Sequence, residues 1–138
     1  MILVDTSALF ALLDRDARQH DAVDSFVAEN DEPLVLSPFV LAELDYLVAE
    51  RFGIDAELAV LDDVSEGAYE LAPFSAEDVA RARAIIVQYR DLRIGLADAS
   101  IVVLAERYET NRVLTLDERH FRALRVGRKR FVVLPADV

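Results

Sequence analysis

Five short apolar runs limit how this chain can fold more than any other feature of its sequence. They are rich in Ile, Leu and Val and do not alternate between apolar and polar residues. Runs of this kind predict strands that are covered on both faces, as in a parallel sheet. The runs occupy residues 2–4, 34–36, 112–114 and 131–134, with a weaker one at 69–71.

Longer stretches with helical periodicity separate these runs. Ser37 followed by Pro38 is a strong helix start, because the hydroxyl can cap the helix and proline suits its first turn. Gly53 is a suitable end for that helix. Ser75 caps a second clear amphipathic pattern, in which apolar residues recur every three or four positions. Further helical patterns lie near residues 22–27, 54–61 and 96–108.

Strands that alternate with helices of ten or more residues imply βαβ units with right-handed crossovers. At 138 residues the chain suits one domain with a substantial core. The sequence therefore predicts a single α/β domain over residues 1–138. We expect a three-layer α/β/α sandwich around a parallel sheet of four to five strands.

Composition excludes several classes of protein. There is no cysteine, which rules out a disulfide framework and thiolate metal sites. No apolar run reaches the ~20 residues of a membrane span, and the N-terminal run contains Asp5 and no basic flank, unlike a signal peptide. We therefore expect a cytoplasmic protein.

The charge is strongly acidic, with 26 acids, 15 bases and a formal net charge of -11. A nucleic-acid partner needs local positive charge, and the bases do crowd into one C-terminal stretch. That stretch contains Arg119, Arg122, Arg125, Arg128, Lys129 and Arg130.

Acids follow two of the expected strands. Asp5 comes directly after the first run and Asp117 comes three residues after Leu114. Glu43 lies in the second turn of the Ser37-capped helix, and Asp98 lies in the first turn of a later helix. Ligands of open α/β sheets bind at the carboxyl ends of the strands, so we expect these four acids to converge on one rim.

Such a cluster needs a neutralising proton or cation. Two carboxylates ~4 Å apart repel by ~4 kcal/mol at an effective dielectric of about 20. Oxygen ligands in an open site favour Mg²⁺ or Mn²⁺, which can activate water and stabilise charge on a phosphoryl group. Asp5 is then a candidate metal ligand, oriented by the hydroxyls of Thr6 or Ser7.

Each acid also has an ordinary interpretation. Asp98 can favour a helix N-terminus through the dipole, and Asp117 can be a turn former or helix cap. Asp45 shares a helix with Glu43, and periodicity alone does not choose between them. Of the two histidines, His120 is expected to be a surface residue.

The segments VDTSALFALL, AELDYL, GLADASIVVLAE and TLDERHF, in this order, resemble the PIN domain and more closely the VapC toxins of bacterial toxin–antitoxin systems. The resemblance covers essentially the whole chain. It maps the family's acidic site to Asp5, Glu43, Asp98 and Asp117, and so favours Glu43 over Asp45. Thr6 matches the family's hydroxyl directly after the first acid, and Thr115 matches the threonine two residues before the last acid.

The resemblance implies a Mg²⁺- or Mn²⁺-dependent endoribonuclease that works as a homodimer and is bound by a VapB-type antitoxin. Asp5, Asp98 and Asp117 would hold the metal, while Glu43 would be a ligand or general base. The implied substrates are structured RNAs, either transfer RNAs or a ribosomal RNA loop. Arg119, Arg122 and Arg125 follow Asp117 closely enough to contact the RNA backbone.

Other interpretations are possible. A phosphoryl-receiving signalling domain also has clustered acids, but it requires a lysine after a late strand, whereas Lys129 precedes the final run. A non-catalytic PIN-fold partner of a DNA-binding antitoxin, acting in transcriptional autoregulation, would not need the full acidic set. A DNA substrate remains open on chemistry alone, because no residue of the sequence reads a 2′-hydroxyl.

Overall fold

Five parallel strands form the centre of the protein in a computed structural model that describes residues 1–138. The order across the sheet is β3-β2-β1-β4-β7. Strands β1 and β4 are therefore adjacent, and neither lies at an edge of the sheet. Backbone pairing matches Leu3 with Val35 on one side and with Val113 on the other. These strands are β1 (Ile2–Val4), β2 (Leu34–Leu36), β3 (Glu70–Leu71), β4 (Arg112–Leu114) and β7 (Val132–Leu134).

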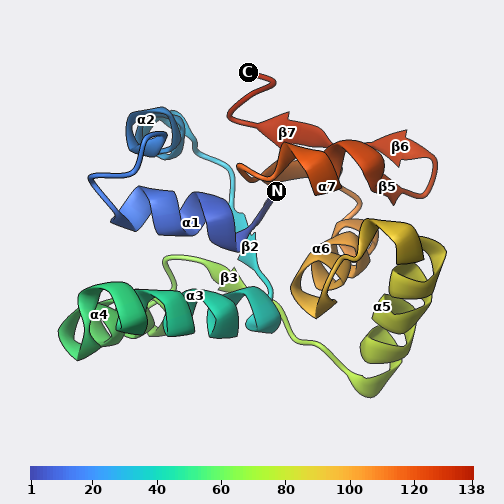
Figure 1. Ribbon diagram of the computed structural model, residues 1–138, viewed down its shortest axis with the longest axis horizontal. Coiled ribbons are helices and arrows are strands. Elements are labelled where there is room, and N and C mark those ends of the chain that lie inside the picture. The colour runs from blue at the N-terminus through green and yellow to red at the C-terminus, as the bar shows by residue number, and fades with distance from the viewer.

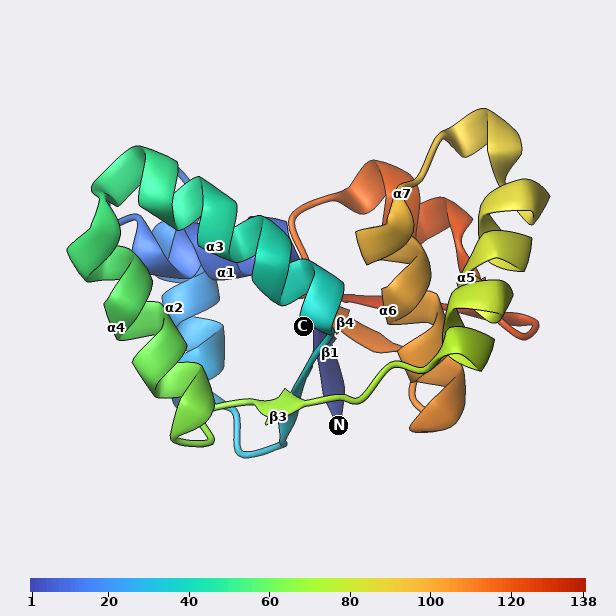
Figure 2. The ribbon, with the colours of Figure 1, turned by 90° about the horizontal axis from the view of Figure 1, so that it is seen from below.

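Helices cover both faces of this sheet, so the predicted three-layer architecture is confirmed, and the sheet has five strands where four to five were expected. The helices are α1 (Thr6–Leu13), α2 (His20–Glu29), α3 (Pro38–Phe52), α4 (Ile54–Ser65), α5 (Ala76–Gln88), α6 (Leu96–Arg107) and α7 (Glu118–Ala123), with a 3₁₀ turn at Arg90–Leu92. Helices α1 to α4 lie on one side and α5 to α7 on the other (Figures 1 and 2). No helix combines the length and apolarity that crossing a bilayer requires.

Local chemistry explains the helix boundaries. The Ser37 hydroxyl accepts a hydrogen bond from the Phe39 backbone N–H at 3.1 Å, and Pro38 occupies the first turn of α3. Helix α3 ends at Gly53, whose φ of 93° suits a residue without a Cβ. Ser75 and Asp78 form a reciprocal capping box at the start of α5.

The core lies between the sheet and both helical layers. All three residues of β1 are fully buried, as the unbroken apolar run predicts. Helix α6 is the most enclosed helix, because every residue from 99 to 105 is buried. It lies between α5 and the strands, so its apolar residues extend around the whole helix. This packing fixes the N-terminal turn of α6, which carries Asp98.

The C-terminal basic stretch contains one element that the sequence did not predict. Residues Arg125–Val126 (β5) and Lys129–Arg130 (β6) pair as a short antiparallel hairpin. Gly127 occupies its tip with a φ of 61°, a conformation that glycine adopts without strain. The hairpin lies beyond the C-terminal end of α7, at the edge of the molecule (Figure 1).

Candidate active site

The strand order places two acids side by side. The chain leaves β1 toward β2 and leaves β4 toward β7, in opposite directions across the sheet. Ligands bind at such a switch point, beyond the carboxyl ends of the strands. Asp5 directly follows β1, and its backbone N–H donates to the Leu114 carbonyl of β4 at 2.9 Å. Asp117 is the N-cap of α7, in the segment that follows β4.

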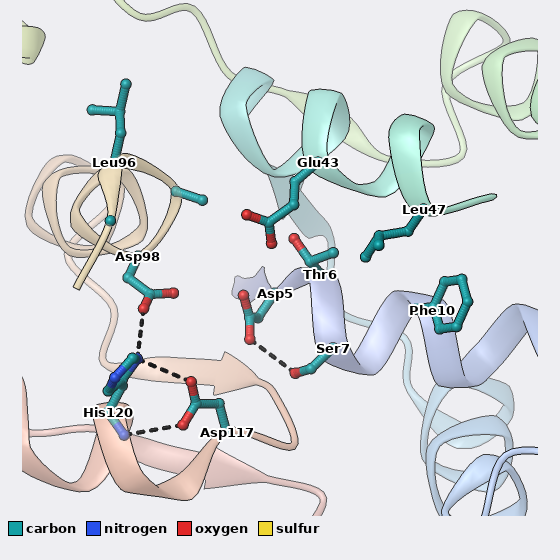
Figure 3. A pocket seen from close by; sticks show the side chains of 12 residues that line it. Asp5, Thr6, Ser7, Phe10, Glu43, Leu47, Leu96, Asp98, Asp117 and His120 are labelled. Carbon is teal, nitrogen blue, oxygen red and sulfur yellow. Dashed lines mark hydrogen bonds and ion pairs between the residues drawn. The ribbon is translucent and has the colours of Figure 1, made fainter. Parts of the chain in front are cut away.

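The helical layers add the other two acids from opposite sides. Glu43 reaches in from α3 and Asp98 from the first turn of α6 (Figure 3). All four acids line one open cavity of about 520 Å³. The remaining lining residues include Thr6, Ser7, Phe10, Leu47, Leu96 and His120. The structure therefore brings together the four acids that the sequence singled out.

Asp45, the alternative to Glu43, lies outside this cavity. Its Oδ1 is buried without a hydrogen-bond partner, and the proximity of its carboxyl group raises the pKa of Glu57 on α4. The side chain of Glu43 is exposed and has neither a hydrogen bond nor an ion pair. Its position on the cavity wall is the geometric reason to choose Glu43.

Two hydroxyls hold the carboxylate of Asp5. Thr115 donates to Asp5 Oδ2 at 2.7 Å and Ser7 donates to the same oxygen at 2.9 Å. The Ser7 hydroxyl also accepts the Leu116 backbone N–H at 3.0 Å, which ties α1 to the segment after β4. Ser7 and Thr115 therefore fix the side chain of Asp5 and the chain that leads to Asp117.

Thr6 behaves differently from the other two hydroxyls. It is 3% exposed, and its Oγ1 is a buried oxygen without any hydrogen-bond partner. A buried hydroxyl without a partner costs about 1–3 kcal/mol. The side chain lines the cavity between Asp5 and Glu43 (Figure 3). An unpartnered oxygen at this position suits a site that receives a ligand.

Electrostatics at the cavity favour an added positive charge. Burial raises the pKa of Asp5 above its ordinary value, and the bonds from Thr115 and Ser7 offset this only in part. Burial also raises the pKa of Asp98 to about 6, reinforced by the negative charge of Asp5 and opposed by a hydrogen bond with His120. No arginine or lysine therefore compensates Asp5 or Asp98, and His120 is the one basic side chain against Asp98.

The prediction that His120 is a surface residue is wrong. Its side chain is 22% exposed and does not lie on the open surface. Ring atom Nδ1 lies 2.8 Å from Asp98 Oδ2 and 3.0 Å from Asp117 Oδ2 (Figure 3). The spacing Asp117-x-x-His120 was the available signal, because residues three apart share a helix face. The contact with Asp98 joins two helices and had no local signal.

The two interpretations of Asp117 are compatible. Its side chain caps α7 by accepting the His120 backbone N–H at 3.1 Å, as a structural role requires. It also lines the acidic cavity. Asp98, Asp117 and His120 offer ligand atoms that lie within 4.8 Å of one another, a spacing compatible with a shared cation.

The arginines after Asp117 divide into two groups. Arg122 contacts both Asp137 oxygens at 2.7 Å and Glu118 at 2.9 Å, so neighbouring carboxylates occupy its guanidinium. Arg125 donates to the carbonyls of residues 122–124 at the end of α7. Arg119 is exposed and has no ion pair, and neither do the hairpin bases Arg128, Lys129 and Arg130.

Comparison with known proteins identifies related sequences. The family model for the PIN domain matches residues 2–126. The chain is 52% identical over 135 residues to ribonuclease VapC26 of Mycobacterium tuberculosis, which covers 97% of this chain and 100% of that protein.

Solved structures with the same fold are more distant in sequence. The crystal structure of VapC20 of Mycobacterium tuberculosis, a toxin described as cleaving the sarcin–ricin loop, aligns with a TM-score of 0.82 and 19% identity, over 93% of this chain and 99% of that one. VapBC2 of Rickettsia felis, bound to a DNA fragment from its promoter, aligns with a TM-score of 0.69 and 18% identity, over 96% and 98% of the two chains. At these identities the likeness concerns the fold.

Proposed function

The chain belongs to the PIN-domain family, in the VapC group of ribonuclease toxins, and from this we propose that it is a Mg²⁺- or Mn²⁺-dependent endoribonuclease. The observation that carries the proposal is the convergence of four acids from separate segments on one cavity. The choice of RNA follows from the relative at 52% identity, which is a ribonuclease.

The residues fit a divalent cation. Asp5, Asp98 and Asp117 provide the carboxylate oxygens that Mg²⁺ and Mn²⁺ prefer, and the unpartnered hydroxyl of Thr6 lies on the wall of the same cavity. Burial and the negative charge of Asp5 raise the pKa of Asp98, and a bound cation would favour its charged form. A bound cation would polarise the phosphodiester and make a nearby water molecule more acidic.

The side chains have distinct tasks in this proposal. Asp5, held by Ser7 and Thr115, keeps a fixed carboxylate at the centre of the cavity. Glu43 is exposed and unpaired, so it can accept the proton of the water that attacks phosphorus. The cavity opens to solvent, which leaves room for a looped-out segment of a structured RNA.

The RNA backbone needs positive charge near an acidic body. Arg119 of α7 and the hairpin bases Arg128, Lys129 and Arg130 are exposed and unpaired, so they can contact phosphates. Arg122 was also a candidate for this role, but we assign it to the fold because Asp137 and Glu118 already bind its guanidinium. The RNA substrate is a transfer RNA or a ribosomal RNA loop, and the protein acts in the cytoplasm, where these RNAs occur.

A VapB-type antitoxin would control this activity. The related Rickettsia protein is a VapBC pair bound to promoter DNA. The net charge of -11 would speed the capture of a basic antitoxin segment, because complementary charge mainly raises association rates. We further propose a homodimer as the toxin unit.

Cleavage of total RNA by the purified protein tests the proposal. We expect discrete new 5′ ends with Mg²⁺ or Mn²⁺, no cleavage with a chelator, and no cleavage by Asp5→Asn. Asp45→Asn is the matched control, because Asp45 lies on α3 outside the cavity. The proposal fails if cleavage survives chelation, or if the metal-loaded protein cuts no RNA. The second result would favour a purely regulatory partner of an antitoxin.

A further inference from the structure

The four-acid site leaves His120 without a task, although its ring lies inside the acidic cavity. Nδ1 lies between two carboxylate oxygens, 2.8 Å from Asp98 and 3.0 Å from Asp117. His120 and Asp117 belong to one turn of α7, whereas Asp98 belongs to α6. The imidazole therefore lies where two proposed metal ligands from different helices meet.

The distances match those of ligands around one cation. Adjacent ligands of an octahedral ion with bonds of about 2.1 Å are about 3.0 Å apart. The two separations from Nδ1 agree with that edge, and all three ligand atoms lie within 4.8 Å of one another. The unpartnered Thr6 hydroxyl, 3% exposed, lies elsewhere on the wall of the same cavity.

A nitrogen ligand changes which metal the site prefers. Mg²⁺ is a hard cation that binds through oxygen and keeps several waters. Imidazole nitrogen favours first-row transition metals, and among these Mn²⁺ also suits carboxylates. An imidazole added to the carboxylates of Asp5, Asp98 and Asp117 therefore makes the site suit Mn²⁺ better than Mg²⁺.

We propose that Nδ1 of His120 binds the divalent cation together with Asp98 and Asp117, and that this nitrogen makes the site prefer Mn²⁺ to Mg²⁺. The inference rests on the proposed function only in that a divalent cation occupies this cavity. Nδ1 offers its lone pair to the metal, so the ring proton is on Nε2. His120 then also holds α6 and α7 together through the ion.

Electron spin-echo spectroscopy of the protein loaded with Mn²⁺, without RNA, tests the nitrogen ligand directly. We expect coupling to ¹⁴N that changes to the ¹⁵N pattern when the protein is labelled with ¹⁵N-histidine. The coupling should disappear in His120→Gln and persist in His20→Gln. His20 is the matched control, because it is the other histidine of the chain and lies on α2, where its Nδ1 is 2.8 Å from the Ala11 carbonyl of α1. Absence of nitrogen coupling in the labelled wild-type protein overturns the proposal without relying on any variant.

Calorimetric titration of each metal tests the preference. Loss of a metal-orienting group typically weakens binding 10- to 100-fold, so we expect His120→Gln to weaken Mn²⁺ binding by about that factor. Mg²⁺ binding should change much less. Equal weakening of both metals would mean that His120 only positions the carboxylates, and no weakening of either would mean that it is not a ligand. Both results overturn the proposal.

These measurements separate the two proposals. Nitrogen coupling in a protein that cleaves no RNA would support the ligand and reject the nuclease. Metal-dependent cleavage by a protein without nitrogen coupling would support the nuclease and reject His120 as a metal ligand.

Discussion

Asp98 and Asp137 are the same side chain in opposite electrostatic settings. Asp137 binds both terminal nitrogens of Arg122 at 2.7 Å and accepts the Val133 N–H at 2.7 Å, and these contacts lower its pKa to about 2. Asp98 is half-buried near Asp5 and has only an imidazole for a partner, and its pKa rises to about 6.

The opposite pKa shifts show that the charged form of Asp137 stabilises the folded protein, whereas the charged form of Asp98 destabilises it. A matched arginine makes the charged form of Asp137 favourable in the native state. Burial and a neighbouring acid make the charged form of Asp98 unfavourable, and no arginine or lysine compensates it. We infer that the cation missing from the protein's own side chains is supplied from solution.

Replacing the two acids should affect cleavage very unequally. Asp98→Asn should reduce the initial rate of RNA cleavage by at least about a hundredfold, since even groups behind the metal ligands contribute up to that factor. Asp137→Asn should leave the rate within about twofold at a temperature where it is folded. Rates measured with Mn²⁺ test this difference, and comparable losses in both variants would remove the distinction.

The substitutions Asp98→Asn and Asp137→Asn should change the free energy of unfolding in opposite directions. Because the folded pKa of Asp98 lies above 3.8, the metal-free protein loses stability as pH rises from about 4 to about 6. The loss persists at pH 7 and amounts to at most about 3 kcal/mol. Urea unfolding with a chelator at pH 7 should therefore show Asp98→Asn to be more stable than wild type.

Asp137 should have the opposite effect on how stability depends on pH. Its folded pKa lies below the ordinary value, so its contribution is present above about pH 4 and disappears as pH falls toward 2. Asp137→Asn should therefore be less stable at pH 7, with a smaller difference from wild type at pH 2. A stabilising Asp137→Asn, or a destabilising Asp98→Asn, would contradict the assignment of the two acids.

Added metal should stabilise the protein through the acidic cavity alone. Mn²⁺ at a hundred times its Kd should raise the free energy of unfolding by about 2.7 kcal/mol. Thermal unfolding at pH 7 measures the shift, which should be absent in Asp98→Asn and retained in Asp137→Asn. An equal shift in both variants would place the bound ion elsewhere.

The smallest expected effect distinguishes the two arginines of α7. Arg119→Gln should weaken RNA binding and reduce the salt dependence of affinity by about one phosphate contact. Arg122→Gln should lower stability, because Asp137 and Glu118 lose their partner, and should leave the salt dependence unchanged. Fluorescence titrations at several salt concentrations measure both slopes. Equal slopes for Arg119→Gln and wild type would exclude Arg119 from the RNA site.

Most of the sheet and the long helices could be predicted because their signals are local. The Ser37-Pro38 start and Gly53 end define α3 from a few neighbouring residues, and the buried strands are unbroken apolar runs. The β5–β6 hairpin was missed because its strands have two residues each and are partly or fully exposed, and they carry charge in place of an apolar pattern.

The site could be predicted only where the acids follow strands or the family resemblance applies. Asp5 and Asp117 follow neighbouring strands, so topology brings them together. Periodicity could not choose Glu43 over Asp45, because the choice depends on how α3 packs. The partners of His120 and Arg122 lie on other elements, at Asp98 and Asp137, and such long-range pairs have no local signature.

Calorimetric titration of Mn²⁺ into the RNA-free protein at pH 6, in two buffers of different ionisation enthalpy, tests the central claim most directly. With the pKa of Asp98 at about 6, binding should be saturable and should release about half a proton from this residue. Asp98→Asn should lose the binding. Absence of binding to the wild-type protein, or undiminished binding to Asp98→Asn, would contradict the account.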